Sequence, residues 1–323
     1  MTDIHEQLTK YLTDAHSIEE QALAQLRTAP DLAGDPEIAR VFREHLTETD
    51  GHERRVWLAL NARGAEPSTV KDTVMRIGGK GFLLFARLQP DTPGKLMAHS
   101  YSYEALEIAS YELLQRVAER AGETEIAELA SEIRDQERAM QERLAAFFDR
   151  AVDASLEAIG RDDLREQLRK YLADAHAIEE QAIALLERAP EASKEAQLIA
   201  IYEEHLVETR EHAELVEARL KALGGDPSTL KDAALRLGAL QWAAFFRAHP
   251  DTPGKLAAFA YAFEHLEIGG YEQLKRVAER AGDEQTARIA EQILVQERAA
   301  AERIASGFDA ALAASLEEQE VNR

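Results

Sequence analysis

Two stretches of the sequence place histidine and glutamate at helical spacing. Residues 45–52 read HLTETDGH and residues 205–212 read HLVETREH. An α-helix turns by about 100° per residue, so the side chains of His45, Glu48 and His52 fall within roughly 60° of one another. Imidazole and carboxylate groups are common ligands of iron, manganese and zinc. The spacing therefore indicates a metal site that the chain contains twice.

Other acids stand where a helix should be apolar. Glu19 interrupts a helical stripe of Leu and Ala residues, and Glu107 and Glu137 interrupt two further stripes in the same way. Glu104 precedes Glu107 by three residues and shares its helix face. A buried carboxylate is costly unless it is paired or binds a metal. Two divalent ions per domain would balance these charges, and oxygen-rich ligation favours iron or manganese over zinc.

The predicted ligand set draws on four helices in each half of the chain. It consists of Glu19, Glu48, His52, Glu104, Glu107 and Glu137 in the first half and of Glu179, Glu208, His212, Glu264, Glu267 and Glu297 in the second. The alternative is a buried, hydrogen-bonded network of acids without metal. For Glu104 and Glu264, exposure to solvent is an equal alternative.

Several neighbouring residues are assigned supporting roles. His45 and His205 are expected to be structural or to hold a ligand in place, because three ligands from one helix would crowd the site. His16 and His176, three residues before an acid of the set, are expected at its rim. Tyr111 and its counterpart are expected in the packed core, with a hydrogen bond to a ligand carboxylate or a radical role as alternatives.

The elements that must position these residues occur in two copies, at an offset of 160 residues. YLTDAHSIEEQAL at 11–23, for example, returns as YLADAHAIEEQAI at 171–183. A repeat of this length is the size of a complete domain. We therefore predict two domains, at residues 1–160 and 161–323.

Each half is predicted to be all-α, because Ala, Leu, Glu, Arg and Gln dominate and no alternating β-branched runs occur. In the first half, helices are expected at about 3–28, 36–63, 92–122 and 124–157. A short connector helix, opening at Ser68, is expected between the second and the third. Four long helices with one long crossover describe a ferritin-like four-helix bundle.

The motifs IEEQAL, HLTETDGHERR, PSTVKD and YEALEIASYELL follow one another in the first half, and the second half carries FEHLEIGGYEQL at 263–274. Together they resemble the YciE/YciF-like branch of the ferritin-like superfamily, a group of bacterial stress-associated proteins. The resemblance covers both halves and implies a four-helix fold with a dimetal site, but little about a reaction.

The chain departs from the usual ferritin-like pattern, in which two helices each carry Glu-x-x-His. His52 follows Glu48 by four residues instead of three, and no histidine accompanies Glu137 on its helix. One metal position is therefore expected to be poorer in imidazole than usual, which would lower its affinity or leave open positions for oxygen or peroxide.

Composition excludes other classes of protein. The formal net charge of -22 repels phosphate backbones, so nucleic acid is not expected as a partner. The chain has no cysteine, which excludes disulfides and thiolate metal sites. The sequence shows neither a signal peptide nor an apolar run long enough for a membrane span, so a cytoplasmic protein is expected.

Two classes of function remain. The first is redox chemistry at a dimetal centre, with iron oxidation or peroxide consumption and O₂ or H₂O₂ as partner. The second is a non-enzymatic stress or metal-buffering protein with degenerate sites, and an iron-storage cage is less favoured. The apolar connectors at 78–90 and 237–250 could each close over their own bundle, but they are expected to meet, which would make the chain an internal pseudo-dimer able to form homo-oligomers. A membrane role is disfavoured because the chain is acidic.

Overall fold

The structure is a computed structural model in which every regular element of the described residues is helical, as predicted. The described residues are 3–65, 92–159, 163–187, 189, 195–226 and 252–319. They form two compact units, Met1–Ala158 with Leu316–Arg323, and Ile159–Ser315. The predicted connector helices and the apolar segments behind the pseudo-dimer prediction lie outside the described residues.

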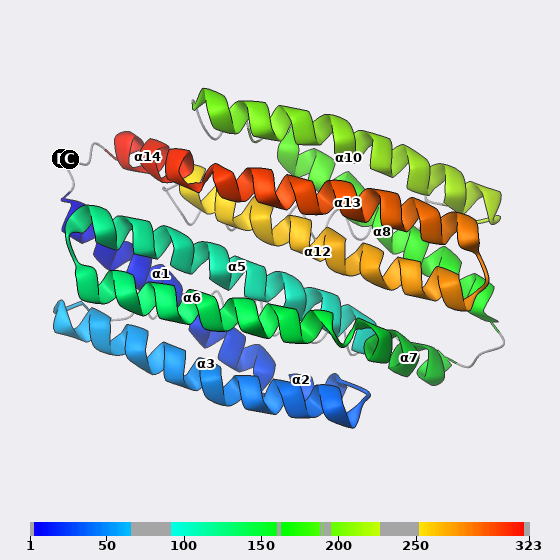
Figure 1. The fold of residues 1–323 in the computed structure, drawn as a ribbon, viewed down its shortest axis with the longest axis horizontal. Coiled ribbons are helices and arrows are strands. Elements are labelled where there is room, and N and C mark those ends of the chain that lie inside the picture. Colours follow the sequence, from blue (N-terminus) through cyan, green and yellow to red (C-terminus); the bar gives the residue numbers. More distant parts are fainter. Residues whose placement is uncertain are drawn as a thin grey trace. The chain divides into compact units, whose positions relative to one another are not determined.

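The two repeats contain the same order of long helices (Figure 1). In the first half these are α1 (Ile4–Leu26), α3 (Pro36–Ala62), α5 (Thr92–Ala121) and α6 (Thr124–Ala145), with the short helices α2 (Ala29–Leu32) and α7 (Phe148–Ile159). In the second half they are α8 (Leu164–Leu186), α10 (Ala196–Ala222), α12 (Thr252–Arg280) and α13 (Glu284–Ser306), followed by α14 (Phe308–Glu318).

The four long helices of each half pack around a common interior. In the first half α1 contacts α3 and α5, and α6 contacts the same two helices. At one end Arg63 Nη1 donates to Glu123 Oε1 at 2.9 Å, and at the other end Phe42 and Leu96 share a core cluster. The helices α3 and α5 therefore run parallel, and residues 63 and 92 lie at opposite ends of the unit.

Local signals in the sequence fix the helix ends. Asp35 precedes α3 and accepts the backbone N–H groups of Glu37 and Ile38 at 2.8 and 3.1 Å. This N-cap satisfies donors that have no partner inside the helix. Between α5 and α6, Gly122 adopts φ 72°, a conformation that glycine tolerates and other residues avoid. The turn can therefore reverse the chain within a few residues.

The expected fourth helix, 124–157, is broken into α6 and α7. The break re-aims the chain so that Phe148 is buried and Ser155 Oγ accepts the N–H of Gly94 at 2.8 Å. That donor lies in the first turn of α5 and has no acceptor within its own helix. The second half breaks at Gly307, and Ser315 Oγ accepts the N–H of Gly254 at the same distance, 2.8 Å.

Apolar layers enclose the middle of the first unit on both sides. On one side Phe42 and Met97 share a core cluster. On the other side, Leu12 lies two turns before Glu19 on α1 and Leu114 lies two turns after Glu107 on α5, and all four apolar residues are fully buried. Water is therefore kept away from the mid-height level, where polar groups interact more strongly than they would in solvent.

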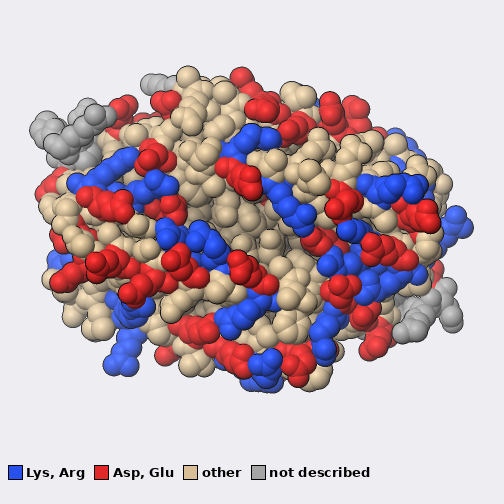
Figure 2. Space-filling view, viewed as in Figure 1, with Lys and Arg blue, Asp and Glu red and all other residues tan. Residues whose placement is uncertain are grey.

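Charged side chains of both signs share the surface. On the face shown in Figure 2, Lys and Arg lie among Asp and Glu. Pairs such as Arg116 with Glu112, 2.7 Å apart, follow the i,i+4 spacing. Much of the acidity is thus partnered and solvated. Among the described helices, none is both long and apolar enough to cross a membrane.

Candidate metal centre

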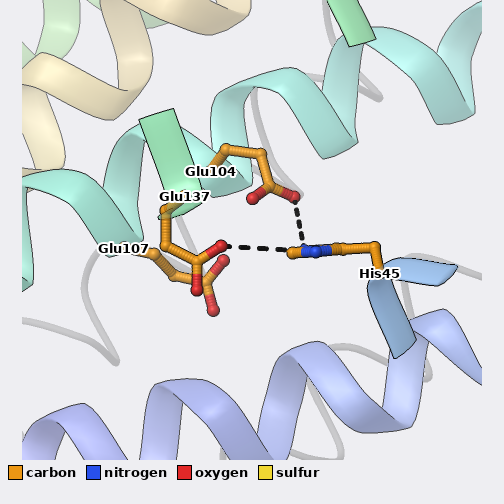
Figure 3. Close-up of side chains that lie close together, drawn as sticks. All are labelled: His45, Glu104, Glu107 and Glu137. Carbon is orange, nitrogen blue, oxygen red and sulfur yellow. Dashed lines mark ion pairs between the residues drawn. The ribbon is translucent and has the colours of Figure 1, made fainter. Parts of the chain in front are cut away.

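Buried donor side chains from three helices meet at mid-height in the first half. His45 on α3, Glu104 and Glu107 on α5 and Glu137 on α6 each offer one donor atom within 4.8 Å of the others. Figure 3 shows the three carboxylates turned toward one another, with the imidazole of His45 reaching in from α3. His45 Nε2 lies 3.2 Å from Glu104 Oε1 and 3.8 Å from Glu137 Oε2.

A second group shares a residue with the first. Glu19 on α1, His52 on α3 and Glu137 also offer donor atoms within 4.8 Å of one another. His52 Nδ1 lies 2.7 Å from Glu137 Oε1 and 4.0 Å from Glu19 Oε1. Because Glu137 belongs to both groups, the two candidate ion positions are adjacent and have a carboxylate in common.

The second half repeats this arrangement. His205 Nε2 lies 2.8 Å from Glu264 Oε2, and His212 Nδ1 lies 2.8 Å from Glu297 Oε1. The corresponding groups are His205, Glu264, Glu267 and Glu297, and Glu179, His212 and Glu297. Both halves therefore keep four carboxylates and two imidazoles.

The interior leaves several of these donors unsatisfied. Glu107 is 1% exposed, and among the described side chains neither of its carboxylate oxygens has a hydrogen-bond partner. Glu267 is in the same condition in the second half. A buried acid without a partner destabilises a fold, so such groups call for a compensating ligand.

Burial and mutual repulsion oppose ionisation of these acids when no cation is present. Burial and the nearby Glu137 raise the pKa of Glu19 to about 8. Burial raises the pKa of Glu104 to about 7, against the favourable charge of His45. The pKa of Glu107 is raised well above its ordinary value by burial and by Glu137. A divalent ion would remove this repulsion and favour the charged forms.

The two histidines are oriented by side chains behind them. His45 Nδ1 lies 3.3 Å from Glu48 Oε2, and His52 Nε2 lies 2.8 Å from Gln136 Oε1. Each acceptor takes the N–H of one ring nitrogen and leaves the other nitrogen facing the carboxylates. Hydrogen bonds of this kind fix the orientation of imidazole ligands in metal sites.

These contacts shift the ionisation of the groups involved. Burial lowers the pKa of His45, but the Glu104 carboxylate and other nearby acids outweigh it and hold the pKa well above its ordinary value. The hydrogen bond from His45, together with Arg143, lowers the pKa of Glu48 to about 2. Glu48 is therefore an ionised acceptor for the His45 N–H.

The structure brings together ten of the twelve predicted ligands and leaves Glu48 and Glu208 outside both groups. The side chain of Glu48 is 43% exposed and pairs with Arg143. The row of buried side chains along α3 contains Thr49 in place of Glu48, and Thr49 is fully buried between the two histidines. His45, expected only to support the site, and its counterpart His205 lie within the groups.

The positions of the apolar residues on α3 indicate that Thr49, and not Glu48, lies on the inward face. At about 100° per residue, Glu48 and Thr49 lie on opposite sides of the line that joins His45 and His52. Phe42 and Leu60 lie on the side of Thr49, and both are fully buried. The inward face is thus centred away from Glu48.

Tyrosine and glutamine residues complete the surroundings. Tyr111, 1% exposed, donates its hydroxyl hydrogen bond to Glu19 Oε1, and Tyr271 does the same to Glu179. The prediction offered this bond only as an alternative for Tyr111. The orienting role of Gln136 was not predicted, although it directly precedes Glu137.

A sequence model of the family described as "Domain of unknown function (DUF892)" matches the chain twice, at residues 3–157 and 163–317. The chain belongs to this family. The two matches confirm the predicted tandem duplication, so the chain carries one DUF892 domain after another. No solved structure matches the chain.

Proposed function

We propose that each DUF892 domain of this chain is a ferritin-like bundle that holds a dinuclear centre of iron or manganese. The helices α3 and α5 run parallel, so the end of α3 and the start of α5 lie at opposite ends of the unit. This arrangement requires a long crossover between them, and one long crossover characterises ferritin-like bundles. The resemblance to the stress-associated YciE/YciF-like branch points the same way.

The shared carboxylate carries the proposal. Two buried donor groups overlap at Glu137, and together they offer four carboxylates and two imidazoles. Four negative charges against two divalent cations leave no net charge in the interior, which offsets much of the cost of burying them. Carboxylate-rich ligation with imidazole suits iron and manganese.

The proposed ligands have separate roles. Glu104, Glu107 and His45 would serve one ion and Glu19 and His52 the other, while Glu137 faces both. Tyr111 restrains Glu19 through its hydroxyl, whereas neither oxygen of Glu107 has a hydrogen-bond partner among the described side chains. When bound, such a metal pair supplies electrons to O₂ or H₂O₂, so iron oxidation or peroxide consumption is the reaction class we propose.

A metal-free network of acids explains the interior less well. A protonated His45 would pair with Glu104, and a protonated His52 would pair with Glu137. Neither pair satisfies the two oxygens of Glu107, and the second half leaves Glu267 in the same state. A cation held by the group that contains Glu107, or Glu267 in the second half, would supply the missing partner.

The first test is the metal content of the full chain, measured by elemental mass spectrometry after growth with added iron and manganese and purification without chelator. We expect about four iron or manganese atoms per chain, because each of two ferritin-like sites holds a pair. Loaded protein should then consume H₂O₂ or oxidise added Fe²⁺ faster than the chelator-treated protein. Full loading without either activity would favour metal buffering.

Paired variants provide the control. Glu107→Ala combined with Glu267→Ala should lower metal content and activity while the helical circular dichroism is kept. Glu119→Ala combined with Glu279→Ala removes exposed acids from the same two helices and should change neither. Absence of metal from the unaltered chain, even after anaerobic Fe²⁺ loading, would overturn the proposal.

A further inference from the structure

A third cluster of metal-ligating side chains lies between α1 and α3 of the first half. His16, Glu20 and Glu53 each offer one donor atom within 4.8 Å of the others. His16 Nε2 lies 3.0 Å from Glu53 Oε1. The cluster shares no residue with the two groups around Glu137.

The cluster is a neighbour of the inner groups but faces another way. Glu20 directly follows Glu19 on α1, and Glu53 directly follows His52 on α3. Because consecutive residues of a helix point about 100° apart, Glu20 and Glu53 face a different direction from Glu19 and His52. His16 is only 4% exposed, whereas the side chain of Glu53 is 21% exposed. The imidazole is therefore held rigidly, while a carboxylate beside it remains open to water.

The second half lacks this cluster. His176 and Glu180 occupy the positions of His16 and Glu20, and His176 Nε2 lies 3.9 Å from Glu180 Oε1. Ala213 stands in the position of Glu53, and no corresponding group exists among the described residues of that half. The chain thus contains a natural counterpart in which one carboxylate is replaced by a methyl group.

We propose that His16, Glu20 and Glu53 bind one divalent transition-metal ion, and that this site exists in the first half alone. One imidazole and two carboxylates form a donor set that suits Zn²⁺, Fe²⁺ or Mn²⁺, with water completing the coordination. Two carboxylates and a neutral imidazole would carry two negative charges, which the ion balances. Its open side admits ions directly from solvent, independently of the enclosed inner groups.

Anomalous diffraction from crystals of the full chain grown with Zn²⁺, recorded on both sides of the zinc edge, tests the site residue by residue. We expect a zinc peak within bonding distance of His16, Glu20 and Glu53, and none beside His176 and Glu180. Glu53→Ala, which gives the first half the residue of the second, should abolish this peak and leave inner peaks unchanged. Asp50→Ala removes an exposed carboxylate one turn earlier on α3 and should leave the peak in place.

The other outcomes of this experiment either overturn or support the inferred site at His16. Zinc at the inner groups without zinc at His16 would overturn the inference, and so would a peak that persists in Glu53→Ala or disappears in Asp50→Ala. A peak at His16 in crystals whose inner groups hold no zinc, iron or manganese would support the inference and count against the dinuclear proposal. The two failures are therefore distinguishable in one experiment.

Discussion

Among the described residues of the first half, Glu137 is the one carboxylate that belongs to both candidate metal-binding groups. It is fully buried and shares the interior with three other acids, so its removal also relieves repulsion. A variant at this position therefore separates metal binding from folding more cleanly than most core substitutions do.

We predict that Glu137→Ala loses both ions of its half while the fold is kept. Metal content should fall from about four to about two atoms per chain, because the second half keeps Glu297. Elemental mass spectrometry and circular dichroism measure the two effects. Glu142→Ala, an exposed acid on the same helix, is the control, and an unchanged metal content in Glu137→Ala would contradict the shared role.

Glu48 is predicted to act through His45 and not as a ligand. Glu48→Gln should weaken metal binding of the first half by about 10- to 100-fold, the usual effect of losing a partner that orients an imidazole ligand. The number of ions at saturating metal should stay the same. Competition with a chromogenic chelator gives the affinity, and a fall in stoichiometry would instead make Glu48 a ligand.

At the residue scale, the sequence predicted the buried acids well, because an acid inside an apolar helical stripe is a strong signal. It was less informative about α3, where His45, Glu48 and His52 all lie close to one face. Whether Glu48 or His45 faces the interior depends on contacts with other helices, which α3 alone does not reveal. Arg143 on α6 pairs with the exposed side chain of Glu48.

At the scale of elements, the break between α6 and α7 links the end of each repeat to the start of its third helix. Ser155 is fully buried, and its hydroxyl oxygen accepts the N–H of Gly94. Both halves contain the same contact, and none of its residues belongs to a candidate metal-binding group, so we expect it to stabilise the bundle end independently of the candidate metal centre.

We predict that Ser155→Ala destabilises the first half by about 1–3 kcal/mol, because it leaves a buried backbone donor without a partner. Urea unfolding followed by circular dichroism measures the change, and metal content should remain unaltered. Ser306→Ala, an exposed serine of α13 that bonds to its own helix, should change stability little. An equal effect of both substitutions would contradict the role of the Ser155 contact.

Helix positions followed from local signals such as Asp35, Pro36 and Gly122, so the predicted starts and ends agree with α1, α3 and α5 to within about two residues. The broken fourth helix was not predicted. In the first half the break falls at Ala146 and Phe147, neither of which disfavours a helix strongly, so tertiary packing decides it.

At the scale of the whole chain, the buried acids make stability depend on pH in a defined direction. Glu19 and Glu104 have pKa values of about 8 and about 7 in the folded, metal-free chain, against an ordinary value of 4.5. Between these limits the folded state holds protons that the unfolded state has released. The free energy of unfolding must therefore fall as the pH rises through this window.

We predict that chelator-treated protein has a lower Tm at pH 8 than at pH 5.5, as measured by calorimetry. The raised pKa of His45 acts in the same direction, because its stabilising charge is lost as the pH rises through the folded pKa. Bound metal should raise the Tm, and this increase should be larger at pH 8 than at pH 5.5, since deprotonation of the ligands strengthens binding. A metal-free Tm that rises over this range would count against the buried carboxylic acids.

Glu137 has a further consequence, for the way each domain fills. The first ion to bind would fix the orientation of this carboxylate, and the second would then meet a ligand already in place. Uptake within a domain should therefore be cooperative, so that at half saturation empty and doubly loaded domains outnumber those with a single ion. A stepwise titration would then resemble an all-or-none switch in each DUF892 domain, with a Hill coefficient above one.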